Sequence, residues 1–113
     1  MDAGLQVHLE KSDDVPVVRV VGEIDLATAP DLRDKLAEIP SDVGTVIVDL
    51  SEVTFLDSTG LSVLVATWKR FDESGDGAFR LVVNQPAVQR VLDVTGLVQV
   101  FAVFPTLKEA LQA

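Results

Sequence analysis

The feature that most constrains the fold is a hydrophobic period that changes repeatedly along the chain. Short runs rich in valine alternate with stretches in which apolar residues return every three or four positions; the runs are "LQVHLE", "VPVVRVVGEI", "TVIVDL", "FRLVVN" and "VQVFAVF". The runs are typical of buried strands, and the stretches are typical of amphipathic helices. Strands that alternate with helices pair in parallel through right-handed crossovers. The sequence therefore predicts an α/β fold with a mostly parallel sheet of about five strands.

The first two runs predict the part of the sheet that is not parallel. Only "KSDD" separates them, and this segment predicts a hairpin-like turn. The second run is apolar almost throughout, as expected of a strand whose two faces are both covered. We therefore expect a mixed sheet.

Four helices are predicted between and after these runs. Thr28 is placed to cap the first helix, and Pro30 suits its first turn because the missing N–H costs nothing there. Pro86 opens the third helix, and Pro105 stands near the start of the fourth. The second helix follows Asp57 and carries an apolar stripe at helical spacing, formed by Leu61, Leu64, Val65, Trp68 and Phe71.

Composition limits the kinds of protein this chain can be. The 113 residues, of which 48% are hydrophobic and 5% aromatic, predict a single domain over residues 1–113 with a core of Val, Leu and Ile. The chain has no cysteine, which excludes disulfides, thiolate metal sites and thiol catalysis. No acidic cluster has the spacing of a calcium-binding loop. We expect no metal and no cofactor.

The charge balance bears on the partners. With 18 acidic and 9 basic residues the formal net charge is -9, and such a surface is repelled by phosphate backbones and anionic lipids. Neither nucleic acid nor a membrane is therefore an expected partner. No signal-peptide pattern and no long apolar span is present in the sequence. We expect a cytoplasmic protein that is a monomer when free.

The segment "EVTFLDSTGLSVLV" places Asp57, Ser58, Thr59 and Gly60 in succession at a helix start. Two interpretations are open. Either Asp57 or Ser58 only caps the helix and Gly60 eases the turn. In the second interpretation, the hydroxyl of Ser58 is modified. The N–H groups and the dipole at a helix start favour a phosphate, and Gly60 leaves room for another protein to approach.

The motifs of several enzyme classes are absent. A serine hydrolase needs a nucleophile elbow and a nearby base, whereas Ser58 stands in "LDSTG" and His8, the single histidine, is far away in sequence. The phosphate-binding loop of nucleotide enzymes does not occur. Asp49 ends a predicted strand, but the acidic pair and the late lysine of a phospho-accepting aspartate switch are not evident. The sequence therefore favours a protein that is not an enzyme.

Four segments resemble one known family. "GEIDLATAPDL", "VIVDLSEVTFLDSTGLSVLV", "NQPAVQRVLDVTGLVQVF" and "FPTLKEAL" are similar, in order and spacing, to the anti-sigma factor antagonists of the STAS domain family. The resemblance runs from about Val17 to Leu111, almost the whole chain. It implies a single STAS-type domain with helices packed largely on one side of a mixed sheet.

The resemblance also implies a switch. In the family, the residue matching Ser58 is phosphorylated by a partner that is both a serine kinase and an anti-sigma factor. The unmodified antagonist binds this partner and releases a sigma factor, phosphorylation ends the binding, and a phosphatase restores it. Asp57, Thr59 and Gly60 surround the modified serine and are expected to contact the partner.

A second segment is expected to join this site. Loops at the ends of neighbouring parallel strands lie together, so the loop after "VVRVVG" is expected beside Ser58. The resemblance implies that Asp25 contacts the kinase, although from local sequence Asp25 is equally a turn residue. Glu23 and Thr28 are predicted contacts by proximity.

The alternative is a STAS accessory subunit that regulates a transporter ATPase or belongs to a stress-sensing assembly. It would have the same fold and use much the same face. The two hypotheses differ in the partner: an ATP-dependent serine kinase for the antagonist, a transporter ATPase for the accessory subunit.

Overall fold

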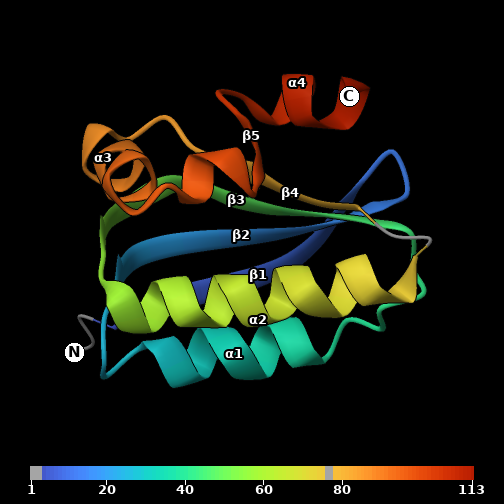
Figure 1. The fold of residues 1–113 in the computed structure, drawn as a ribbon. Helices are drawn as coiled ribbons and strands as arrows, with labels where there is room; N and C mark the ends of the chain where they lie inside the picture. The colour runs from blue at the N-terminus through green and yellow to red at the C-terminus, as the bar shows by residue number, and fades with distance from the viewer. Residues whose placement is uncertain (1–3, 76–77) are drawn as a thin grey trace.

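The computed structural model describes residues 4–75 and 78–113, which form one five-stranded sheet with helices on both of its faces (Figure 1). The elements follow in the order β1 (Gln6–Ser12), β2 (Val15–Ile24), α1 (Ala29–Ala37), β3 (Thr45–Leu56), α2 (Ser58–Ser74), β4 (Ala78–Val82), α3 (Pro86–Thr95), the 3-10 turn η1 (Leu97–Gln99), β5 (Ala102–Phe104) and α4 (Leu107–Gln112).

The predicted mixed sheet is confirmed. The strands lie in sequence order, β1 is antiparallel to β2, and the other three neighbouring pairs are parallel. Asp13 and Asp14 take left-handed backbone conformations, with φ of 52° and 66°. Such a two-residue turn matches the right-handed twist of the two strands that it joins, so "KSDD" forms the expected hairpin.

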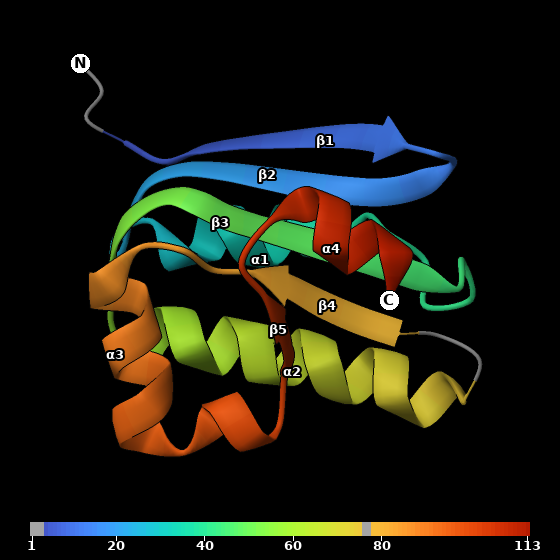
Figure 2. The ribbon, with the colours of Figure 1, turned by 90° about the horizontal axis from the view of Figure 1, so that it is seen from above.

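Helices α1 and α2 lie side by side under one face of the sheet, and α4 lies over the other (Figures 1 and 2). The larger core is on the α1–α2 side and also receives Val88 and Leu92 of α3. The smaller core, on the α4 side, joins Ala110 of α4 to Val17, Ile47 and Val82 of the strands. The helices are therefore mostly on one side, as expected, with α4 as the exception.

Double coverage explains the composition of the central strands. Val17 and Val18 are 2% and 0% exposed although they point to opposite faces of β2. Residues 46 to 50 of β3 are all buried for the same reason. An apolar run without alternation is thus the sequence signature of a strand between two layers of helix.

Two strands, β3 and β5, differ from the predicted runs by several residues. β3 continues six residues past Leu50, to Leu56, because residues 51–56 still pair with β2, through two shifts of register. The run "VQVFAVF" is only partly a strand: its first residues belong to η1, and β5 begins at Ala102. Val98 packs against the core from this turn, so the run needs no strand to bury its apolar residues.

Among the described residues, no helix combines the length and the hydrophobicity needed to cross a membrane.

Candidate functional site

The candidate site lies at one end of the sheet, where β2 and β3 finish and lead into α1 and α2 (Figure 1). The two strands pair up to their last residues, Ile24 and Leu56. The N–H group of Asp57 donates a hydrogen bond to the Ile24 carbonyl at 3.2 Å, which extends the contact beyond the strands. The loop that carries Asp25 and the helix start that carries Ser58 are therefore neighbours, as the sequence predicted.

Asp57 is the residue that caps α2. Its backbone is extended, and its Oδ1 accepts hydrogen bonds from the N–H groups of Thr59 at 3.0 Å and Gly60 at 3.1 Å, and from the Thr59 hydroxyl. The hydroxyl of Thr59, followed by these N–H groups, lowers the pKa of the Asp57 carboxyl below its ordinary value of 3.8 against the opposing effect of desolvation. The carboxylate therefore stays charged and satisfies donors that the first turn of a helix would otherwise leave open.

Ser58 is the first residue of α2, and its side chain is exposed. Its carbonyl accepts a hydrogen bond from the hydroxyl of Ser62 at 3.0 Å, one turn further along the helix. Because Asp57 provides the cap, the hydroxyl of Ser58 can be modified without removing the interaction that starts the helix.

Gly60 has a role different from the expected one. The residue is buried, and a Cβ atom built on it would lie 2.5 Å from Ile24 Cγ2 and 2.5 Å from Leu56 Cδ1. Such distances are far inside van der Waals contact. The missing side chain therefore lets α2 pack closely on the ends of β2 and β3, rather than opening the surface to another protein.

Asp25 organises the loop between β2 and α1. Its Oδ1 accepts hydrogen bonds from the N–H groups of Ala27 and Thr28, both at 3.0 Å. The hydroxyl of Thr28 accepts from the Asp25 N–H at 2.9 Å and donates to the Glu23 carbonyl at 2.8 Å. Thr28 occupies the N-cap position of α1 but makes no side-chain cap, so the predicted capping role is wrong: its hydroxyl bonds back into the loop instead.

Sequence reasoning missed the apolar residues around this end of the sheet. Leu26, in the Asp25 loop, is 75% exposed, and Phe55, the strand partner of Glu23, is 46% exposed. Both side chains are therefore available to a partner that covers this end of the sheet. The signal in the sequence was an isolated leucine within the polar loop "EIDLATAP".

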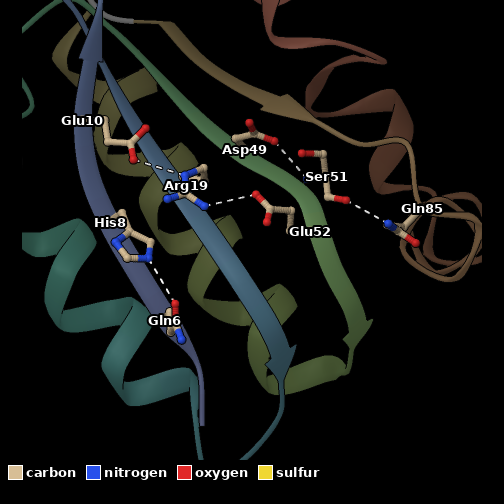
Figure 3. A network of polar contacts seen from close by, with 8 residues as sticks. All are labelled: Gln6, His8, Glu10, Arg19, Asp49, Ser51, Glu52 and Gln85. Atoms are coloured by element: carbon tan, nitrogen blue, oxygen red, sulfur yellow. Dashed lines mark hydrogen bonds and ion pairs between the residues drawn. The ribbon is translucent and has the colours of Figure 1, made fainter. Parts of the chain in front are cut away.

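A second polar cluster lies on the sheet face opposite α1 and α2 (Figure 3). Arg19 of β2 forms ion pairs with Glu10 of β1 and Glu52 of β3, each at 3.1 Å, and the hydrogen bonds to Glu10 and Glu52 raise the pKa of Arg19. His8 lies within this cluster and bonds to Gln6. Exposed pairs of this kind join strands but contribute little to stability.

Two further contacts in Figure 3 hold the middle of β3. The Ser51 N–H donates to Asp49 Oδ1 at 2.9 Å, and Gln85 Nε2 donates to the Ser51 carbonyl at 2.8 Å. Asp49 is buried and serves this strand. Within residues 4–75 and 78–113, no group of three or more His, Cys, Asp or Glu side chains is placed to hold a metal ion.

The acid sensitivity of Asp57→Ala tests the capping interaction. A carboxyl whose pKa is lowered by folding stabilises the fold above its unfolded pKa, and this contribution disappears as the pH falls through the lower, folded value. At pH 7 the variant should lose about 1 kcal/mol of unfolding free energy. The difference in unfolding free energy between the variant and the wild type should become smaller below pH 3.8. Urea unfolding across this range measures it, with Asp42→Ala, at an exposed loop position, as the control. A difference in unfolding free energy that does not change with pH would show that the charge of Asp57 does not contribute to stability.

Substitution of Gly60 tests the close packing at the helix start. Alanine is a better helix former than glycine by about 1 kcal/mol, but overpacking costs about 1–3 kcal/mol. Because the added Cβ would overlap Ile24 and Leu56, Gly60→Ala should lower the melting temperature. Gly4→Ala is the matched control, since its Cβ would meet nothing within 4 Å. An unchanged or raised melting temperature for Gly60→Ala would show that the contact is not tight.

Comparison with known proteins agrees with this geometry. The family model described as "STAS domain" matches residues 6–110. The anti-sigma-F factor antagonist RsfB of Mycobacterium tuberculosis is 35% identical over 108 residues, which cover 95% of this chain and 87% of the relative. The anti-sigma-B factor antagonist of Bacillus subtilis is 33% identical over 93 residues, or 82% of this chain and 84% of the relative.

A solved structure extends the similarity to three dimensions. The crystal structure of an anti-sigma factor antagonist from Mycobacterium paratuberculosis superposes with a TM-score of 0.86 at 36% identity, over 99% of this chain and 95% of the other. A match of this extent, in both sequence and fold, covers the whole sheet and the site at its end. The chain therefore belongs to the STAS domain family.

Proposed function

We propose that this protein is an anti-sigma factor antagonist that works as a phosphorylation switch. Its unphosphorylated form binds an anti-sigma factor that is also a serine kinase, and a sigma factor is released. Phosphorylation of Ser58 ends the binding, and a phosphatase that acts on phospho-Ser58 restores it. The observation that carries the proposal is the exposed Ser58 hydroxyl at a helix start that its neighbour Asp57 already caps. The names of the relatives support the coarser function.

The protein supplies only the acceptor in the reaction. The kinase would transfer the terminal phosphoryl group of ATP to the Ser58 oxygen, with ADP leaving and the hydroxyl proton passing to a base of the kinase. Nothing in this step requires a catalytic group of the antagonist. The arrangement of Ser58, exposed and on a rigid helix, is suited to an acceptor that another protein must reach.

The switch would act through charge rather than through unfolding. A phosphate adds about -1.5 to -2 charges beside the Asp57 carboxylate and close to the Asp25 loop. The N–H groups of Thr59 and Gly60 already donate to Asp57, so these donors cannot neutralise the phosphate without leaving the cap. The new charge would therefore stay at the surface that the partner must cover. A 100-fold loss of affinity needs only about 2.7 kcal/mol.

The remaining residues of the site would divide between contact and support. Glu23, Asp25 and Thr59 stand at or near the surface beside Ser58 and would contact the partner. Asp57 and Thr28 would hold the helix start and the loop through their hydrogen bonds. Gly60 would contribute by keeping the helix against the strands.

Phosphorylation of the purified protein tests the acceptor. Incubation with a candidate anti-sigma factor kinase and ATP should add one phosphate, on the peptide that carries Ser58, as seen by intact-mass and peptide analysis. Ser58→Ala should remove the labelling, whereas Thr59→Ala should keep it, because the hydroxyl of Thr59 is bonded to Asp57. Labelling that persists in Ser58→Ala and disappears in Thr59→Ala would move the site to Thr59. Recovery of a transporter ATPase instead of a kinase from a pull-down would favour the accessory-subunit function.

Binding by Ser58→Ala and Ser58→Asp tests the charge mechanism. Alanine adds no charge, so this variant should bind the anti-sigma factor like wild type and should not be released by ATP. Aspartate carries one charge, so its affinity should fall, by about tenfold, less than with phosphate. Both variants should keep the circular dichroism spectrum of the wild type, because the cap is Asp57. Their free energies of unfolding, obtained from thermal melts, should lie within about 0.5 kcal/mol of the wild-type value. Equal affinity of the two variants, measured by calorimetric titration, would count against charge exclusion.

A further inference from the structure

A groove of about 540 Å³ runs between α1 and α2. Leu32 and Leu36 of α1 and Leu64 and Phe71 of α2 are buried toward the sheet and do not line it. The lining comes from the flanks of the two helices, where Ser62 and Ala66 are exposed. The groove is therefore open to solvent, while the buried Ala29 and Thr67 form part of its lining.

Small side chains on the facing flanks create the groove. Ala29 and Ala37 of α1 stand on one side, and Ser62 and Ala66 of α2 stand on the other. Neighbouring helices whose facing residues are larger would fill this space with their own side chains. Leu32, Leu36, Leu64 and Phe71 of the two helices belong to the core beside the sheet.

The groove begins at the candidate site. Leu26 of the Asp25 loop and Thr59 of α2 line its first end, and the hydroxyl of Ser62 donates to the Ser58 carbonyl. Leu26 is the large apolar side chain that is 75% exposed at this end of the sheet, and no contact within the part of the chain that the structure describes explains its exposure. A partner that covers Ser58 and Asp25 thus meets the mouth of the groove without a break in the surface.

The groove also carries positive charge in a protein whose formal net charge is -9. Arg33 lines it with a side chain that is 65% exposed, and its ion pair, with the adjacent Asp34 at 3.6 Å, is exposed and weak. Arg70, near the far end, donates to the carbonyls of Leu36 and Ile39, so it closes the last turn of α1 and helps to hold the two helices together. Arg33 is the cation that an incoming carboxylate can reach.

We propose that this groove binds an amphipathic segment of the anti-sigma factor, with aliphatic side chains between α1 and α2 and a carboxylate directed at Arg33. The proposal rests on the proposed function and adds to it the chemistry of the partner. Two observations favour this occupant: the groove is continuous with the surface around Ser58, and Arg33 gives it a positive charge. The interface then has two parts: a part around Ser58 that phosphorylation changes, and the groove, which it leaves unchanged.

This division has a consequence for the kinase reaction. The groove holds the partner through residues that do not react, so its loss should weaken binding without altering phosphoryl transfer. A variant with a filled groove should therefore raise the KM for phosphorylation of Ser58 and leave kcat unchanged. A variant altered at the acceptor itself would change kcat.

Filling the groove tests the proposal. Ala66 is exposed, and methionine is a good helix former, so Ala66→Met should fold normally while its side chain occupies the groove. Its affinity for the anti-sigma factor kinase that labels Ser58 should fall at least tenfold, with the KM rising in proportion. Ala87→Met, at an exposed position of α3 outside the groove, should stay within twofold of wild type.

Charge reversal gives a second, independent measurement. Arg33→Glu should weaken binding at least fivefold, and Arg90→Glu, on α3, is its control. If Ala66→Met and Arg33→Glu both bound the kinase with wild-type affinity, the proposal that the groove binds the partner would be wrong, and the proposed function would remain intact. Loss of self-association in Ala66→Met by ultracentrifugation, with unchanged kinase affinity, would assign the groove to a second copy and also overturn the proposal. Failure of the wild-type protein to bind the kinase would overturn both.

Discussion

The geometry of the site depends on the close contact between the first turn of α2 and the last residues of β2 and β3. Ile24 and Leu56 fill the space where a Cβ of Gly60 would stand, and the Asp57 N–H is bonded to the Ile24 carbonyl. A well-packed interior resists small shifts, so three elements joined in this way have one relative position. The orientation of Ser58 and the nearness of the Asp25 loop both follow from it.

Two adjacent residues divide the work at the helix start. Asp57 accepts hydrogen bonds from the N–H groups of the first turn, and Ser58 is exposed to solvent. If one residue did both, phosphorylation would alter the interaction that starts the helix. With the roles separated, modification can change the charge of the surface while the fold persists. The proposed switch needs this property, because the phosphorylated protein must be able to return to its first state.

Much of the fold follows from local patterns. The hairpin at Asp13 and Asp14, the buried central strands and the helix that begins at Pro86 agree with turn chemistry and hydrophobic period. The extension of β3 to Leu56 does not, because residues 51–56 are partly exposed and their pairing with β2 involves residues about thirty positions away. The end of a strand is decided by its neighbour in the sheet, which a period within one segment does not contain.

The sequence by itself determined the alternation of strands and helices, the chemical groups at the start of α2, and the order that places the Asp25 loop beside them. Only the tertiary structure decided which residue caps the helix, that Thr28 bonds back into its loop, and that Gly60 serves packing. It also decided that small residues from two separate helices face each other across an open groove. The physical reason is that period and capping chemistry act within one element, whereas close contacts and surface shape arise only where elements distant in sequence meet.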